Sequence, residues 1–259
     1  MAELLGTVRR ATRVLDYLAA RSEPVPIKRL AQELGLNLST AYHLMNTLAC
    51  EGYAARDTAG GGYRLGSKVA LLGDAYARAW PVEPALRALV AELGARTSEN
   101  AYLAMANGTD VVITDIVESQ QRVRVHALHR GYSSDLHARA LGKAVLAFLD
   151  EAVVRRHFAE HPPRRLTART VVSIDAILSE LERVRRRGSS EDVEEFCEGV
   201  CCLGAPFFAA DGRPAGSLSV SMPSFRFRAR RIGAREAVLQ AANAATAALQ
   251  SVERGVHHG

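Results

Sequence analysis

The sequence has little of what marks a secreted, membrane-spanning or disulfide-stabilised protein. Its 259 residues contain four cysteines and one tryptophan, and no apolar run reaches the roughly 18 residues that a membrane span requires. The N-terminus shows neither the apolar core nor the cleavage site of a signal peptide. Cys197, Cys201 and Cys202 crowd into one segment, whereas a disulfide framework would spread them out. We therefore expect buried thiols in a cytoplasmic protein with no membrane partner.

The motifs of the common enzyme classes are missing as well. The sequence contains no nucleophile elbow, P-loop, dinucleotide fingerprint or zinc-protease motif. A hydrolase could use Cys201 or Cys202 as nucleophile and His137 as base, but sequence alone does not show that these side chains meet. The spacings of His126, His129 and His137 match no common metal site. We predict a protein that is not an enzyme and holds no metal or cofactor, with the cysteine- and histidine-dependent hydrolase as an alternative.

The charge of the chain permits binding to nucleic acid without demonstrating it. The net charge is +5 and the pI is near 9.2, while 48% apolar and 24% charged residues are typical of a soluble globular protein. Much of the basic charge lies far downstream, in the runs Arg183–Arg187 and Arg226–Arg235. We interpret these runs as solvated surface of helices and loops rather than as a track for DNA.

Helical periodicity dominates the first third of the chain. Apolar residues at helical spacing predict helices over residues 8–20 and 27–34, followed by a third helix. Gly35 stands where a left-handed residue ends a helix, and Asn37 or Ser39 can cap the next one. Two short helices joined by so tight a turn form either an ordinary helical hairpin or a helix-turn-helix that enters a DNA groove.

After this hairpin the periodicity changes to that of strands. Residues 53–56 and 63–65 flank a glycine-rich tip, which predicts a β-hairpin, and residues 67–79 predict a helix that ends before Trp80-Pro81. Three helices, a two-stranded wing and a further helix are the order of a winged helix-turn-helix with a linker. The domains expected from this order are a DNA-binding domain over residues 1–66 and a linker helix over residues 67–81.

The remainder of the chain predicts an α+β domain over residues 82–253, with a tail at 254–259. Strands arrive as hairpins with helices between them, which favours an antiparallel sheet flanked by helices. Asn107-Gly108 is a strong turn signal between two of these strands. The expected strands are residues 101–105, 111–117, 122–128, 200–208 and 215–222. The expected helices are residues 83–97, 138–149, 151–160, a helix capped by Ser173 and ending at Arg187, and 230–252.

If residues 27–50 are a helix-turn-helix, the solvent side of the second helix faces the major groove. Ser39 and Thr40 then suit phosphate contacts at the start of the helix. Asn46 could read adenine, and His43 could donate to an acceptor on guanine. Arg56 and Arg64 on the wing would reach phosphates or the minor groove. The candidate DNA-binding residues are Lys28, Asn37, Ser39, Thr40, Tyr42, His43, Asn46, Arg56 and Arg64.

The residues from 7 to 80 resemble the IclR family of bacterial transcription regulators. The resemblance is carried by Arg13-Val14-Leu15-Asp16, Leu30-Ala31-Gln32-Glu33-Leu34-Gly35-Leu36, Ser39-Thr40 and Gly62-Tyr63-Arg64-Leu65-Gly66. Two positions depart from the family pattern, since Leu38 replaces a usual basic residue and His43 stands where arginine is common. The resemblance therefore implies a DNA-binding surface that is less basic than usual.

The residues from about 82 to 252 are similar to the effector domain of the same family. This likeness is carried by residues 136–144, 191–196 and 199–202. It implies a GAF-like effector-binding domain in a ligand-responsive repressor or activator, which binds a pseudo-palindromic operator. It also implies dimers through the N-terminal domains and linker helices, and tetramers through the effector domains.

Ser217, Ser219 and Ser221 alternate with apolar residues, so a strand would place the three hydroxyls on one face. The resemblance implies that such a face lines a pocket for a small, carboxylate-bearing metabolite. Serine hydroxyls and the backbone N–H groups that open the 138–149 helix could donate to an anion. The implied effector-binding residues are Ala140, Leu141, Asp192, Cys202, Ser219 and Ser221.

Two of the implied pocket residues set limits on the ligand. Ionised Asp192 would repel a carboxylate, so we expect it to accept from a ligand hydroxyl or to bind through water. Leu141 stands where the family frequently has a smaller residue, and it should shrink the pocket or make it more apolar. A further alternative is a DNA-binding protein that responds to no ligand, although the polar serine strand argues against it.

Overall fold

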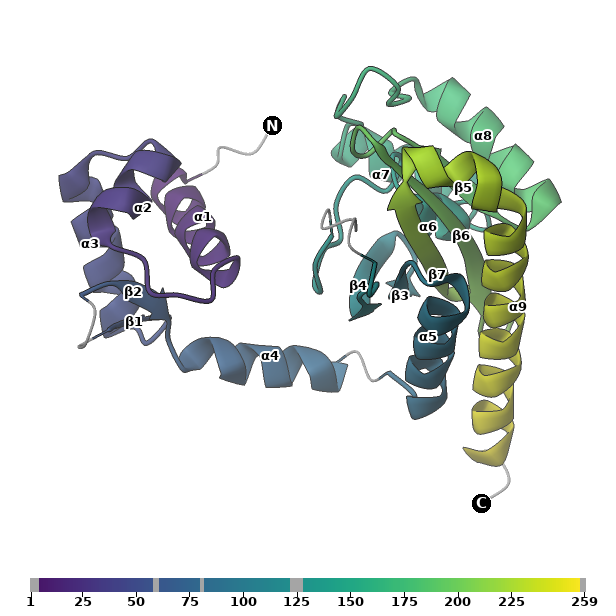
Figure 1. The fold of residues 1–259 in the computed structure, drawn as a ribbon, viewed down its shortest axis with the longest axis horizontal. Helices are drawn as coiled ribbons and strands as arrows, with labels where there is room; N and C mark the ends of the chain where they lie inside the picture. The colour runs from purple at the N-terminus through teal and green to yellow at the C-terminus, as the bar shows by residue number, and fades with distance from the viewer. Residues whose placement is uncertain (1–4, 58–60, 80–81, 122–127, 257–259) are drawn as a thin grey trace. The chain divides into compact units, whose positions relative to one another are not determined.

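The computed structural model describes residues 5–57, 61–79, 82–121 and 128–256, and the chain divides into two compact units, Met1–Pro81 and Val82–Gly259. In the described part of the chain, no helix is both long and apolar enough to cross a membrane. The elements of the first unit are α1 (Gly6–Ala19), α2 (Ile27–Leu34), α3 (Leu38–Cys50), β1 (Ala54–Arg56), β2 (Tyr63–Leu65) and α4 (Lys68–Ala79) (Figure 1).

The helix-turn-helix forms as its sequence predicts. Gly35 ends α2 with a φ of 65°, the left-handed conformation that glycine adopts without strain. Asn37 caps α3, because its Oδ1 accepts a hydrogen bond of 2.7 Å from the backbone N–H of Thr40. The wing joins this core through Tyr63, which is buried and pairs through its backbone with Val25. The tip of the wing, at residues 58–60, lies outside the described residues.

The second unit contains a five-stranded antiparallel sheet in the order β4-β3-β7-β6-β5. Its strands are β3 (Asn100–Asn107), β4 (Asp110–Val117), β5 (Ser190–Val193), β6 (Val200–Phe208) and β7 (Pro214–Pro223). Its helices are α5 (Pro84–Thr97), α6 (Ala140–Leu146), α7 (Glu151–Glu160), α8 (Ile174–Arg187) and α9 (Ser224–Val256). The α+β class predicted from the sequence is confirmed.

Several predicted boundaries in this unit are wrong. The sequence did not predict β5, because a strand of only four residues carries little periodic signal. Helix α6 begins two residues later than predicted and ends three residues earlier, since Arg139 still has an extended backbone. Helix α9 begins at Ser224, directly after β7, and not near residue 230. The strand predicted over residues 122–128 lies outside the described residues except for Leu128.

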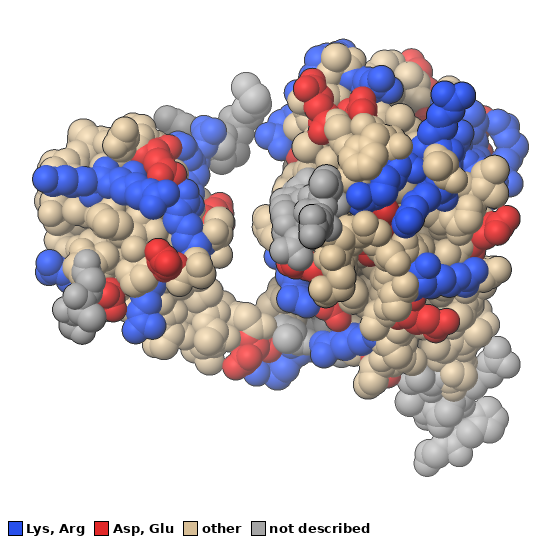
Figure 2. All heavy atoms as spheres, viewed as in Figure 1, with Lys and Arg blue, Asp and Glu red and all other residues tan. Residues whose placement is uncertain are grey.

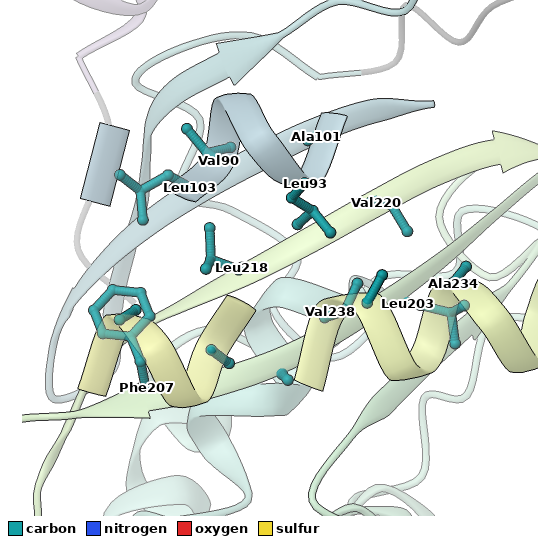
Figure 3. Packing of buried hydrophobic residues seen from close by; sticks show 14 of the residues in the cluster. Val90, Leu93, Ala101, Leu103, Leu203, Phe207, Leu218, Val220, Ala234 and Val238 are labelled. Atoms are coloured by element: carbon teal, nitrogen blue, oxygen red, sulfur yellow. The ribbon is translucent and has the colours of Figure 1, made fainter. Parts of the chain in front are cut away.

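The sheet separates two hydrophobic layers. On one face, α5 and α9 pack against side chains of the central strands, among them Leu103, Leu203, Leu218 and Val220 (Figure 3). On the other face, α6, α7 and α8 cover residues such as Ile113. The predicted alternation of β7 is confirmed, because its leucine and valine face the first layer while its serines lie on the side of α6. The serine face is therefore buried beneath a helix and is not open to water.

The downstream arginine runs are not simply solvated surface, which corrects their interpretation from the sequence. Glu99 of the segment before β3 is buried and accepts two hydrogen bonds, of 2.7 and 2.8 Å, from the guanidinium of Arg226. Glu191 is buried on β5 and is held in the same way by Arg231, with Arg235 as a second partner. These arginines neutralise buried carboxylates that come from distant parts of the chain, a relation that sequence patterns do not reveal.

Candidate functional sites

The exposed face of α3 carries the residues predicted to touch DNA. Ser39, Tyr42, His43 and Asn46 follow one another at helical spacing, and all four are exposed, while the opposite face of the helix packs into the core. Thr40 is half-buried next to the cap. Thus α3 presents a continuous polar surface while its apolar side is buried, as insertion into a groove requires.

The remaining predicted DNA-binding residues flank this face or hold the helix in place. Lys28 is exposed on α2, and Arg56 and Arg64 are exposed on the two paired strands of the wing. Asn37 is also exposed, but its side-chain oxygen is already used as the cap of α3. Asn37 is therefore suited to positioning the helix, and only its amide nitrogen is free of that cap.

Three arginines of α1 form part of the same surface, and sequence reasoning missed them. Arg9, Arg10 and Arg13 line a groove together with the α2–α3 turn and Thr40. Arg13 also donates a long hydrogen bond of 3.5 Å to the carbonyl of Leu34, at the end of α2. A band of basic side chains crosses the visible face of the first unit over α1 and α2 (Figure 2). The adjacent pair Arg9-Arg10 was the available signal.

In the second unit, strand register gathers the predicted effector residues. Asp192 on β5 lies opposite Cys202 on β6, which lies opposite Ser221 on β7, so the three occupy one row across the sheet. Ser219 lies in the next row, opposite Tyr102 on β3. All six predicted residues line one cavity, whose full lining is Tyr102, Leu128, Arg139, Ala140, Leu141, Asp192, Phe196, Val200, Cys202, Ser219 and Ser221.

The start of α6 is fixed directly on the sheet above this row. The Ser190 hydroxyl donates 2.7 Å to the carbonyl of Ala140, and the Ser217 hydroxyl donates 3.0 Å to that of Leu141. Gly204 permits this approach, because a Cβ there would lie 2.9 Å from the Ser190 hydroxyl and 3.0 Å from the Ala140 backbone. Ser217 and Ser190 therefore anchor the helix.

Two hydroxyls of the cavity already bond to each other. The Tyr102 hydroxyl lies 3.0 Å from Ser221 Oγ, and the Asn100 amide donates 3.3 Å to the same tyrosine oxygen. Ser219 Oγ has only a marginal contact, at 3.5 Å, with the carbonyl of Val220. Ser219 is thus the predicted pocket serine whose hydroxyl is most available to a ligand.

Asp192 combines burial with a fixed orientation. Its Oδ1 accepts hydrogen bonds from the backbone N–H groups of Glu195, at 2.7 Å, and Phe196, at 3.3 Å. Burial raises the pKa of Asp192 to about 7, although the positive charge of Lys143 and these backbone bonds act in the opposite direction. Asp192 is therefore partly protonated near neutral pH, when its carboxyl group can donate as well as accept.

Arg139 is the residue of the cavity that the sequence analysis overlooked. It is the N-cap of α6, its side chain is 2% exposed, and none of its three guanidinium nitrogens has a hydrogen-bond partner. Burial lowers the pKa of Arg139 to about 10, so the group stays charged at neutral pH. Its position in the mostly apolar stretch of residues 138–149, which contains one other charged residue, Lys143, was the signal in the sequence.

The cavity is narrow in this conformation. Its volume of about 10 Å³ is room for roughly one water molecule. Leu141 and Phe196 occupy part of the lining, and the central guanidinium carbon of Arg139 lies over the ring of Tyr132, 4.8 Å from the ring centroid. Any larger ligand must therefore displace side chains of the lining as it binds.

The hydrolase alternative finds no support in the geometry. Cys201 packs into the hydrophobic layer on the α5 and α9 side of the sheet, and Cys202 lies on the other side, as alternation predicts. Burial raises the pKa of Cys201 to about 11 and that of Cys202 well above its ordinary value, which disfavours a thiolate nucleophile. His137 is buried, and its Nε2 lies 2.9 Å from the carbonyl of Arg164. Within the described residues, no three potential ligands form a metal site.

A polar helix-turn-helix surface on one unit and an enclosed polar cavity in the other define the class of a DNA-binding regulator with an effector domain. Comparison with known families identifies both parts. Residues 7–58 match the IclR helix-turn-helix domain, and residues 75–248 match the C-terminal domain of bacterial IclR transcriptional regulators.

Similar proteins extend over nearly the whole chain. The regulator BhcR of Paracoccus denitrificans is 32% identical over 93% of this chain and 87% of its own length. The regulator KdgR of Escherichia coli is 30% identical over 92% of this chain and 90% of its own length. The crystal structure of Thermotoga maritima IclR superposes with a TM-score of 0.71 at 25% identity, covering 94% of this chain and 98% of that one.

The chain belongs to the IclR family and is a DNA-binding transcriptional regulator with an effector-binding domain. It is therefore not an enzyme, and a bacterial regulator of this family acts in the cytoplasm, where its DNA lies. The resemblance found in the sequence is confirmed over both units.

Proposed function

We propose that the chain binds a pseudo-palindromic operator as a dimer or tetramer, and that a small carboxylate-bearing metabolite in the effector cavity modulates this binding. The observation that carries the proposal is that all six effector residues inferred from the resemblance line one enclosed cavity. Independently, α3 exposes a row of polar side chains, with Leu38 at its start, and buries its apolar face in the core.

On the DNA, α3 lies in the major groove with its first turn toward the phosphates. Ser39 and Thr40 contact phosphate, while His43 and Asn46, further along the exposed face, reach base edges. The wing arginines Arg56 and Arg64 contact the adjoining backbone or minor groove, and Lys28 and Tyr42 lie at the margin of this surface. Because Leu38 is apolar and His43 stands where arginine is common in the family, the arginines of α1 supply additional phosphate contacts.

Two copies are needed, because one recognition helix contacts too few base pairs to select a site. Helices about 34 Å apart in a dimer read successive major grooves of a pseudo-palindrome. Helix α4 carries the matching self-association surface, since Leu71, Leu72 and Tyr76 are 61%, 50% and 39% exposed on it. Apolar side chains exposed in this number on one helix favour burial against a second copy.

The metabolite acts by binding one arrangement of the effector domains better than another. Only such a difference in affinity can shift the equilibrium between arrangements, and the shift reaches DNA as a change in spacing between the two recognition helices. Whether the regulator is a repressor or an activator depends on which arrangement fits the operator. The narrow cavity is also what a regulator without a ligand would have, and a ligand screen separates the two.

The first experiment is fluorescence anisotropy with a duplex from the gene's own upstream region, at about 0.15 M salt, where weak surface contacts are screened. Excess unrelated duplex competes for nonspecific binding. We expect tight binding that survives the competitor and weakens in Ser39→Ala and His43→Ala. Ser179→Ala, an exposed serine of α8 in the other unit, is the matched control and should bind normally. Binding that the competitor abolishes equally for all four proteins would contradict the proposal.

The effector is sought by thermal unfolding in the presence of candidate metabolites. A ligand that binds the folded protein stabilises it by RT ln(1 + [L]/Kd), so saturable stabilisation identifies one chemical class. Each hit is then added to the complex with DNA. A ligand that stabilises the protein and changes its affinity for the operator supports the regulator. A complete absence of stabilising metabolites would favour the ligand-independent DNA-binding protein.

A further inference from the structure

Among the described residues of the second unit, the buried charged side chains have hydrogen-bond partners, except for Arg139. Lys143 donates 2.6 Å to Glu195, and the buried carboxylates of Glu99 and Glu191 are each held by arginines. Buried Asp192 accepts two backbone N–H groups. Arg139 lies four residues before Lys143 and is equally buried, yet none of its nitrogens donates a hydrogen bond. Proteins bury charge with a partner, so the missing anion requires an explanation.

The guanidinium of Arg139 contacts an aromatic ring without using its N–H donors. Its central carbon lies over the ring of Tyr132, 4.8 Å from the ring centroid, which is a cation–π contact. The N–H groups of a guanidinium lie in its plane and fit a carboxylate through two parallel hydrogen bonds. Arg139 also lines the cavity with Asp192 and Ser219. Arg139 thus borders the cavity with N–H donors that no described residue accepts.

No carboxylate among the described residues accepts a hydrogen bond from Arg139. The only carboxylate that lines the cavity is Asp192, whose Oδ1 is used by the loop that follows β5. Glu195 is taken by Lys143. Asp135 accepts two hydrogen bonds, of 3.1 and 2.7 Å, from Arg164 and a third from Tyr132. Among the described residues of the lining, Arg139 is therefore the cation that has no hydrogen-bonded carboxylate, and it can bind one carboxylate of a ligand.

We propose that Arg139 is the specificity-determining anion site of the effector cavity, where its guanidinium binds the carboxylate of a short organic monoacid through paired N–H donors. The inference rests on the proposed function, because it assigns the charged end of the effector. A monoanion is favoured over a phosphate dianion, which would need a second free cation. Ser219 and Asp192 then lie beside the polar remainder of the acid, and Leu141 and Phe196 limit its length.

Formate and acetate are the probes, because each carries the carboxylate with almost nothing attached and suits the narrow cavity. The full chain is unfolded thermally in rising sodium formate or sodium acetate, against sodium chloride at the same ionic strength and pH. We expect a saturable rise in Tm beyond that in chloride for the wild-type chain. The apparent Kd should be at least tenfold weaker in Arg139→Met, and intermediate in Arg139→Lys, which keeps the charge but loses the planar fork.

Arg155→Met is the matched control, since this exposed arginine pairs with Glu151 on α7, away from the cavity lining. It should respond to acetate like the wild type. Without added anion, Arg139→Met should unfold at the same temperature as the wild type or higher, because it removes an unpaired buried charge. If that variant does not fold, Arg139→Gln removes the charge while keeping a polar side chain, and it serves in its place.

Two outcomes would overturn the assignment. One is equal stabilisation of the wild type and Arg139→Met by the carboxylates, which would place the anion elsewhere. The other is no stabilisation of the wild type beyond that in chloride. Neither readout involves DNA, so the result is independent of the operator experiment. In the complete system, Arg139→Met should still bind the operator and should lose the response to the effector acid.

Discussion

The two units treat polar side chains in opposite ways. In the first unit, the residues proposed to touch DNA are exposed, apart from the half-buried Thr40, and apolar side chains such as Met45 fill the core. In the second unit, the proposed site is enclosed, and five Asp, Glu, Lys or Arg side chains among its described residues are buried. An unpaired polar group on a surface is solvated at no cost, so exposure alone says little about function. Inside a protein each unpaired charge costs several kcal/mol, so an unpaired Arg139 is informative where an unpaired Arg64 is not.

The sharpest test of this contrast removes one partner of a buried pair. Lys143→Met would leave the carboxylate of Glu195 buried without its cation, and we expect a loss of about 3–5 kcal/mol in the free energy of unfolding. Urea denaturation of the full chain, followed by circular dichroism, measures the loss. The double variant Lys143→Met with Glu195→Leu should recover much of it. A loss below about 1 kcal/mol would show that burial of the pair matters little.

The second prediction concerns pH. The folded-state pKa of Asp192, about 7, lies above the ordinary aspartate value, so the folded chain keeps a proton that the unfolded chain has lost. Its contribution therefore lowers stability as pH rises from about 4 to about 7, and stays constant above that range. Asp192→Asn removes this dependence. Between pH 5 and pH 8, the unfolding free energy of the wild type should therefore fall relative to that of the variant by roughly 2–3 kcal/mol. Urea denaturation at both pH values decides, and parallel pH curves for the two proteins would contradict the assignment.

Substitutions on the exposed face of α3 should weaken DNA binding without changing the stability of the fold. Asn46→Ala should weaken operator binding by about 1–3 kcal/mol, because a base contact is lost. The unfolding free energy should change by less than about 0.5 kcal/mol, since the side chain is exposed. Anisotropy and urea denaturation provide the two numbers. Thr47→Ala, on the same helix, is the control, because its hydroxyl is occupied by the carbonyl of His43.

The smallest predicted effect is that of a phosphate contact. Arg10→Ala should weaken binding to the operator and to unrelated duplex by similar factors, because phosphates carry no sequence information. The slope of log affinity against log salt concentration should become shallower by about one. An anisotropy titration at four salt concentrations would measure it. Loss of sequence preference in this variant would mean that Arg10 reads bases and is not confined to the backbone.

Local signals in the sequence were sufficient for the first unit. Gly35, Asn37 and the apolar spacing of α2 and α3 act on neighbours a few residues away, so they could be interpreted without a tertiary structure. The strands of the second unit were also largely predictable, as was the division of the β7 residues between two faces. The short strand β5 was not predicted, because it depends on pairing with β6 and has little pattern of its own.

The candidate cavity, too, was predictable only in part from the sequence. Family resemblance pointed to its six predicted residues. The structure brings four of them together through strand register across β5, β6 and β7, and α6 adds Ala140 and Leu141. The same resemblance could not reveal that Arg139 is buried without a partner. Sequence shows that an arginine is present, but whether its charge is paired depends on every chain segment that packs around it.

What the sequence determined by itself is the winged helix, the α+β class of the larger unit, the family and the polar face of α3, because each rests on short-range periodicity, caps or motifs. What only the tertiary structure decided is the electrostatics. Arg226 and Arg231 could pass for surface residues until Glu99 and Glu191 lay against them, each contributed by a distant segment. Burial and pairing are properties of three-dimensional neighbours, and they separate the arginines that stabilise this fold from the one left for an anion.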